Sequence, residues 1–275
     1  MQSLFSMDEY MDLVSQEIKL PDGAILPSPA VIAFVGAGGK TSVMFWLAQQ
    51  FKAMALRVFC TTTTHMYRPK PSQCDTLILN DNAIARLGIL KKHATAGQIV
   101  YCASTCEPSL NKIKGLAPQE IDTIKALDLF DVYLVEADGA QGLTIKAPAI
   151  HEPVIPSHTD VVMALVSAQS LLRPANSALI HRWESFVAIT QCQEGMVIDE
   201  TILCRLIRHP SGMFKNTSKQ AIRILVINAL DLALSESSLI ALSQKLLNKN
   251  PPLQAIWLIQ TEHKTQVLRH LITKN

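Results

Sequence analysis

The sequence predicts an α/β fold of three layers, in which helices cover both faces of a mostly parallel sheet. Short, uninterrupted apolar runs such as Val31–Val35 and Val132–Val135 alternate with longer segments whose apolar residues recur at helical spacing. This alternation is typical of parallel strands joined by crossover helices. A glycine-rich turn directly after the first run is the second indication, because it places a tight connection between a strand and the start of a helix.

The individual elements follow from the same two patterns. Strands are expected at 31–35, 57–60, 76–79, 98–102, 132–135, 161–166, 222–227 and 255–259, and helices at 40–54, 82–92, 118–127 and 237–247. Residues 1–29 are expected to form a short helix and a loop, because prolines and a glycine punctuate the approach to the first strand. Residues 30–275 then form a single domain, with a small helical insertion at about 170–220 that can fold over the site as a lid.

Composition narrows the class of protein. With 48% hydrophobic residues, the 275-residue chain can bury a substantial core, and its net charge of +2 lacks the basic surplus of a nucleic-acid binder. The chain opens without the basic flank and apolar core of a secretory signal, and no apolar stretch approaches membrane-spanning length. We therefore expect a cytoplasmic protein with neither a membrane nor a nucleic-acid partner. The six cysteines are expected to be reduced thiols, because Cys102 and Cys106 lack a second pair that would complete a zinc site.

The glycine-rich turn has the composition of a phosphate-binding loop. It contains Gly36, Ala37, Gly38, Gly39, Lys40, Thr41 and Ser42. Glycines allow main-chain N–H groups to surround an anion, Lys40 supplies positive charge, and the Thr41 hydroxyl can bind the Mg²⁺ that accompanies ATP or GTP. The full pattern needs a glycine where Phe34 stands, so a tight strand-to-helix turn without a ligand is the alternative. The functional interpretation predicts a sheet of the P-loop NTPase type.

Two acidic residues follow a central strand. Glu136 and Asp138 come directly after the run 132–135 and are followed by Gly139. Ligands of open α/β sheets bind at the carboxyl ends of strands, where a carboxylate can hold Mg²⁺ or act on an attacking water. We interpret both residues as metal ligands and Asp138 also as catalytic, with an acidic turn that merely ends the strand as the alternative.

Further candidates lie in loops that the same rule places near this edge. Lys146 can neutralise developing phosphate charge, and His151 or Glu152 can accept a proton from a second substrate; satisfying the main chain of a proline-rich loop is the alternative role. Within the Thr61–Thr64 run, Thr63 is a third candidate for Mg²⁺, beside Thr64 and His65 as residues that line the site.

A possible base-reading pair ends the apolar run 222–227. Asn228 and Asp231 have the spacing of the N-K-x-D motif of GTPases, in which the carboxylate accepts hydrogen bonds from guanine. Ala229 replaces the lysine of that motif, and Asn and Asp also cap helices, so guanine selectivity and simple capping both stay open.

Taken together, these blocks resemble the YqeC family. The resemblance rests on Gly36–Thr41, Thr61–Met66, Val135–Ala140, Lys146–Pro156, His181–Arg182 and His209–Gly212, in that order. That family is described as a selenium cofactor biosynthesis protein, or an accessory protein of selenium-dependent molybdenum hydroxylases. The resemblance implies a P-loop NTPase-like protein, with binding roles for Gly38, Gly39, Lys40, Thr41 and Asp138.

The leading hypothesis is an ATP- or GTP-dependent NTPase with Mg²⁺ that serves the maturation of a molybdenum hydroxylase. Its partner would be a selenium- or molybdenum-cofactor intermediate or the apo-hydroxylase. One alternative is a small-molecule phosphotransferase that acts on an acceptor hydroxyl or a selenium-containing acceptor. The other is a non-enzymatic chaperone of the cofactor that nucleotide binding gates.

Overall fold

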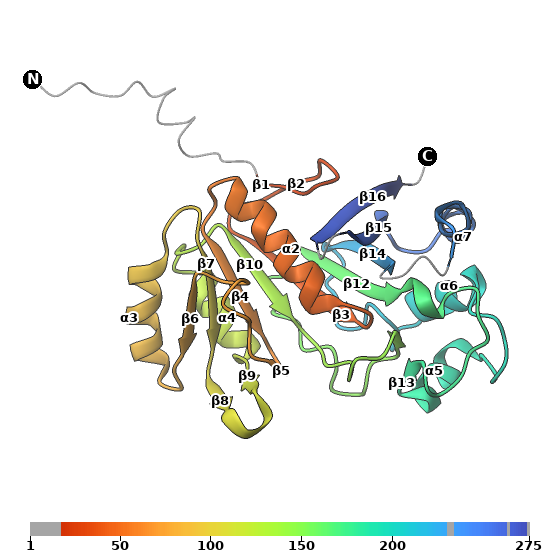
Figure 1. The fold of residues 1–275 in the computed structure, drawn as a ribbon, viewed down its shortest axis with the longest axis horizontal. Coiled ribbons are helices and arrows are strands. Elements are labelled where there is room, and N and C mark those ends of the chain that lie inside the picture. The colour runs from red at the N-terminus through yellow and green to blue at the C-terminus, as the bar shows by residue number, and fades with distance from the viewer. Residues whose placement is uncertain (1–17, 230–233, 263–264, 274–275) are drawn as a thin grey trace, which may run out of the picture.

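The computed structural model describes residues 18–229, 234–262 and 265–273 (Figure 1). A nine-stranded sheet forms the centre of the molecule. From edge to edge it contains β6 (Thr76–Leu79), β7 (Ile99–Ala103), β4 (Val58–Thr62), β10 (Val132–Glu136), β3 (Ala30–Gly36), β12 (Val161–Ser167), β14 (Ile222–Ala229), β15 (Ala255–Glu262) and β16 (Thr265–Thr273). The neighbouring strands from β6 to β15 pair in parallel, and β16 pairs with β15 in the antiparallel direction. The predicted α/β class with a mostly parallel sheet is confirmed.

The central strands are buried on both faces, which explains their continuous apolar sequences. Every residue of β3, β4, β7, β10 and β12 is buried. A parallel sheet that is covered on both sides selects such uninterrupted runs, whereas a half-exposed sheet would show polar residues at alternate positions. Each of the eight strands expected from the sequence is present; seven lie within two residues of their expected bounds, and β15 ends three residues later than expected, at Glu262.

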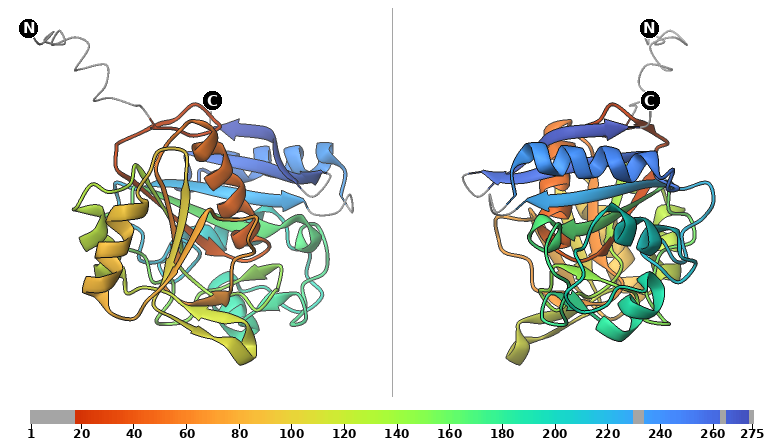
Figure 2. Two further views of the ribbon diagram at one scale, coloured as in Figure 1. Left: turned by 60° about the vertical axis from the view of Figure 1, so that its left-hand side comes forward. Right: turned by 90° about the vertical axis from the view of Figure 1, so that its right-hand side faces the viewer.

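Helices lie on both faces of the sheet (Figure 2). On one face α2 (Lys40–Ala53) packs through Val43, Leu47 and Phe51, and the antiparallel pair β1 (Ile18–Lys19) and β2 (Ile25–Leu26) packs into the same cluster. The other face carries α3 (Ala83–His93), α4 (Pro118–Lys125), α5 (Trp183–Thr190), α6 (Glu200–Arg208) and α7 (Glu236–Asn248).

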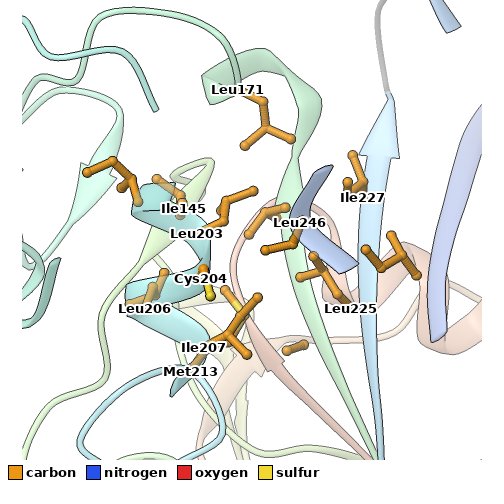
Figure 3. Packing of buried hydrophobic residues seen from close by; sticks show 14 of the residues in the cluster. Ile145, Leu171, Leu203, Cys204, Leu206, Ile207, Met213, Leu225, Ile227 and Leu246 are labelled. Atoms are coloured by element: carbon orange, nitrogen blue, oxygen red, sulfur yellow. The ribbon is translucent and has the colours of Figure 1, made fainter. Parts of the chain in front are cut away.

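The segment 170–220 contains two of those helices, α5 and α6. Leu203, Leu206 and Ile207 of α6 share an apolar cluster with Leu225 and Ile227 of β14, as Figure 3 shows. The segment is also tied to the rest of the chain by β11 (Ile145–Lys146), which pairs in parallel with β13 (Ile180–His181). Closure of this segment as a lid stays a prediction.

Some elements differ from the expectations. A three-stranded antiparallel sheet of β5 (His65–Tyr67), β9 (Lys112–Lys114) and β8 (Thr105–Glu107) projects beyond β4 and β7. Short 3-10 helices occupy Pro108–Leu110 and Ala168–Ser170. Where a loop was expected before the first core strand, the structure has the β1–β2 pair, while residues 1–17 of the expected helix lie outside the described residues. Within the described residues, every helix is too short or too polar to cross a membrane.

Candidate functional site

The glycine-rich turn lies at the carboxyl edge of the sheet, between β3 and α2. Strand β3 has β10 on one side and β12 on the other. After β3 the chain builds the half of the sheet that ends at β6, and after β10 it crosses to build the half that ends at β16. In open α/β sheets such a reversal of strand order leaves a crevice where ligands bind.

Three glycines of the turn adopt backbone conformations that other residues rarely take. The φ angles are 88° at Gly36, 86° at Gly38 and 112° at Gly39. A Cβ atom on Gly38 would overlap the main-chain nitrogen of Ser167, and one on Gly39 would overlap the side-chain amide of Asn228. The turn therefore needs glycine both for its conformation and for its close approach to β12 and β14.

The main-chain N–H groups from Gly38 to Ser42 make no hydrogen bond to other described residues. Upstream, Gly36 N–H donates to Oδ2 of Asp138 at 3.0 Å and Ala37 N–H donates to the Leu165 carbonyl at 3.0 Å. Downstream, the first helical bond runs from Val43 N–H to the Gly39 carbonyl. Between them, no N–H group of 38–42 has an acceptor within the described residues, and no side chain caps α2. Consecutive unpaired N–H groups at the positive end of a helix can bind an anion.

Lys40 is held beside the turn. Its Nζ donates to the Gly36 carbonyl at 2.7 Å and lies 3.1 Å from Oδ1 of Asp138, and its side chain is buried. Burial by itself lowers the pKa of Lys40, but the negative charges of Asp138 and Glu136 outweigh it, so the pKa is raised. Lys40 therefore stays positively charged next to the unpaired N–H groups.

The Thr41 hydroxyl and the Glu136 carboxylate face each other across the turn. The hydroxyl donates to Oε2 of Glu136 at 2.7 Å. Burial raises the pKa of Glu136, although Lys40 and the Thr41 hydrogen bond act in the opposite direction. A hydroxyl and a buried carboxylate in contact are hard oxygen donors of the kind that Mg²⁺ binds.

Asp138 joins the turn to a second group of charges. Its Oδ2 accepts from Gly36 N–H and lies 3.1 Å from Nζ of Lys146. Its Oδ1 is fully buried and forms an ion pair with Nζ of Lys40 at 3.1 Å, but it accepts no well-aligned hydrogen bond. This oxygen therefore keeps lone-pair capacity beside Lys40, which fits the predicted Mg²⁺ ligand.

The second group of charges consists of Lys146, Glu152 and Arg182. Nζ of Lys146 lies 2.8 Å from Oε2 of Glu152 and donates to the Gly139 carbonyl at 2.5 Å. Nη2 of Arg182 lies 3.1 Å from Oε1 of Glu152. Although burial acts to raise the pKa of Glu152, the hydrogen bonds and charges of Lys146 and Arg182 lower it to about 2. The structure thus brings Lys146, Glu152 and Asp138 into contact.

Other predicted site residues lie apart from this group or in different roles. His151 is exposed, and the Thr63 hydroxyl donates to the Val154 carbonyl at 2.7 Å instead of facing Glu136. Nδ2 of Asn228 donates to the Gly38 carbonyl at 2.8 Å, so this residue supports the turn, while its Oδ1 is buried without a partner. Asp231 lies outside the described residues, so the base-reading pair stays a prediction.

Sequence reasoning assigned no individual role to three residues of the site, Arg182, His181 and Ser167. Arg182 binds Glu152 from a left-handed backbone conformation, with φ 63°, at the start of α5. His181 and Lys146 are register partners in the β13–β11 pair. The sequence signal for His181 and Arg182 was their place in the His181–Arg182 block of the family resemblance. For Ser167, nothing in the sequence marks it as the residue that Gly38 approaches closely.

Comparison with known proteins gives concordant results. The family described as "YqeC protein" matches residues 32–184 of this chain. The Escherichia coli (strain K12) protein named "Uncharacterized protein YqeC" is 33% identical over 247 residues, which cover 89% of this chain and 92% of the relative. The match to the family spans the glycine-rich turn, Glu136, Asp138 and the charged group up to Arg182.

Proposed function

The chain belongs to the YqeC family, and from this premise we propose that it binds a nucleoside triphosphate, ATP or GTP, and hydrolyses it. The proposal places the phosphates on the glycine-rich turn of a P-loop NTPase-like fold. It also gives each of the clustered side chains a part in binding or in chemistry.

One observation carries the proposal: the consecutive unpaired N–H groups of 38–42 lie next to the charged ammonium of Lys40. N–H groups and a helix dipole favour a bound anion, and a mobile ammonium can follow the negative charge of a terminal phosphate. The Gly36 carbonyl and Asp138 hold Lys40 in place, and both are weaker partners than a phosphate that carries several charges.

Mg²⁺ fits the oxygen atoms on the other side of the turn. Thr41, Glu136 and Oδ1 of Asp138, which accepts no well-aligned hydrogen bond, would hold it, and they supply hydroxyl and carboxylate oxygens. When bound, this ion neutralises charge on the phosphates. The same carboxylates keep Lys40 and the start of the turn in position.

We place this activity in the maturation of the selenium or molybdenum cofactor of a molybdenum hydroxylase. The support for this role is the resemblance of the motif blocks to proteins described in those terms. The client would be a cofactor intermediate or the apo-hydroxylase, and cytoplasmic location is part of the same proposal.

Replacement of Lys40 tests the proposal. We expect Lys40→Ala to weaken ATP and GTP binding by at least about 100-fold, because an interaction with a multiply charged phosphate is lost. Isothermal titration calorimetry with Mg²⁺ and each nucleotide measures this change. Lys52→Ala is the matched control, because Lys52 lies on the same helix and its pair with Asp75 is at the surface. Equal nucleotide affinity of Lys40→Ala and the parent protein would contradict the proposal.

The same preparations separate the alternatives. Steady phosphate release without an acceptor supports the NTPase. Transfer of the terminal phosphate only when an acceptor is present supports the phosphotransferase, for which the open space beside Gly139 leaves room. Tight binding without either reaction supports the nucleotide-gated chaperone.

A further inference from the structure

His181 is a buried side chain at the edge of the charged group, and it has no part in the proposed binding of phosphate or Mg²⁺. It lies in β13 as the register partner of Lys146, and its exposed fraction is 8%. Within the part of the chain that the structure describes, its ring makes no hydrogen bond. Both ring nitrogens keep some contact with solvent, because neither is among the side-chain atoms that are enclosed and lack a hydrogen-bond partner. A buried imidazole with an accessible lone pair is available to a water molecule or a ligand.

The other titratable groups of the cluster are already occupied. Both carboxylate oxygens of Glu152 bind cations, and Asp138 lies between two ammonium groups, each at 3.1 Å. Nζ of Lys146 lies near three oxygen atoms, on Gly139, Asp138 and Glu152, which match its three protons. Glu136 accepts the Thr41 hydroxyl. Protonating any of these carboxylates breaks an ion pair or a hydrogen bond, whereas protonating His181 breaks none that the described residues make.

His181 is placed relative to the glycine-rich turn by strand register. It is the main-chain register partner of Lys146 in the β11–β13 pair, and register partners carry their side chains on the same face of the pair. Nζ of Lys146 reaches Asp138 on that face, and Asp138 contacts both Lys40 and the N–H of Gly36. The terminal phosphate is proposed to lie near Lys40, so the imidazole starts from the same face as the side chain that reaches this part of the site.

We propose that His181 accepts the proton of the water that attacks the terminal phosphate of the bound nucleotide. The inference rests on the proposed NTPase function. The water oxygen forms a bond to the terminal phosphorus, and the bond from that phosphorus to the bridging oxygen breaks. The electron pair of the broken bond leaves on the nucleoside diphosphate, and one proton of the water passes to a ring nitrogen of His181.

The electrostatic surroundings support this role. The pKa of His181 is lowered from 6.5, first by burial and then by the positive charges of Lys146 and Arg182, while Glu152 and Asp138 act in the opposite direction. The ring is therefore neutral at neutral pH and has a lone pair for the proton.

The test combines nucleotide binding with single-residue replacement. We expect His181→Gln to bind ATP and GTP with unchanged affinity but to release phosphate at least about 100-fold more slowly, the usual size of a general-base contribution. His158→Gln is the matched control, because His158 is an exposed histidine and its ring contacts Asp122. Calorimetry measures binding, and a coupled phosphate assay measures kcat. Thermal unfolding shows whether either variant is folded.

The pH dependence gives a second readout that does not rely on a variant. In the parent protein, kcat should fall as pH drops through a pKa below 6.5, and NMR titration of the His181 ring should give the same value. An unchanged kcat in His181→Gln, or a kinetic pKa that differs from the ring value, would each overturn the inference. Absence of nucleotide binding or of hydrolysis in the parent protein would instead remove the proposed function.

Discussion

Asp138 and Glu152 act together at the scale of single residues, because they share Lys146 between them. Lys146 lies 3.1 Å from Asp138 and 2.8 Å from Glu152, and all three side chains are at most 7% exposed. Removing one member of a buried ion pair leaves an uncompensated charge, and this costs more than the net gain from forming the pair. The group is therefore sensitive to pH and to substitution.

Glu152→Gln tests this sensitivity. The pKa of Glu152 is about 2 in the folded protein and 4.5 ordinarily, so the stability it contributes is present above pH 4.5 and is lost as pH falls toward 2. We expect Glu152→Gln to lower the free energy of unfolding at neutral pH by about 3 kcal/mol, and by less at about pH 3. Urea unfolding of both proteins across this pH range measures the difference. Glu194→Gln is the matched control, because Glu194 is an exposed glutamate.

The sequence indicated which residue types form the turn but not what holds them. Gly36–Ser42, Glu136, Asp138, Lys146 and Glu152 could be chosen because each lies near the end of an apolar run or in a proline-rich loop. Their neighbours Ser167 and Arg182 depend on contacts between distant segments, which local patterns do not encode. His151 shows the converse, since its neighbour Glu152 is buried while His151 itself faces solvent.

At the scale of elements, a glycine inside α3 lowers the stability of that helix. Gly88 lies within this helix, is exposed, and has open space where a Cβ would be added. We expect Gly88→Ala to raise the free energy of unfolding by about 0.5–1 kcal/mol, because alanine loses less backbone entropy in a helix. Chemical unfolding measures the gain. Gly115→Ala should do the opposite, because its Cβ would overlap the Thr62 carbonyl; equal effects of the two variants would contradict this explanation.

Five of the strands that the sequence predicted, β3, β4, β7, β10 and β12, are buried at every position. Strands such as β3 and β12 are apolar throughout, so their sequences differ clearly from those of helices and loops. The small sheet of β5, β8 and β9 was not predicted, because its strands are three residues long and each has at most one buried position. Such short strands are defined by their pairing and not by a pattern of their own.

At the scale of the whole molecule, one hydrogen bond joins two segments that are far apart in the chain. Nε1 of Trp257, in β15, donates to Oδ2 of Asp22, between β1 and β2, at 3.0 Å. Trp257 is fully buried, so its N–H group has no water as an alternative partner. The pair β1–β2 is thereby fixed to the later half of the sheet.

Asp22→Ala should lower the free energy of unfolding by about 1–3 kcal/mol, because it leaves the buried indole N–H unpaired. In a Trp257→Phe background the same change should cost much less, since the donor is already absent. A double-mutant cycle by urea unfolding measures the coupling. Additive effects would show that the bond contributes nothing, and nucleotide affinity should stay the same in all variants.

The glycine-rich turn is completed by residues that the ribosome adds much later. Asp138 follows Gly36 by 102 positions, and Asn228 follows Gly38 by 190. Translation must therefore pass residue 228 before the turn has all of its supports. Until then the nascent chain contains this segment without the residues that hold it.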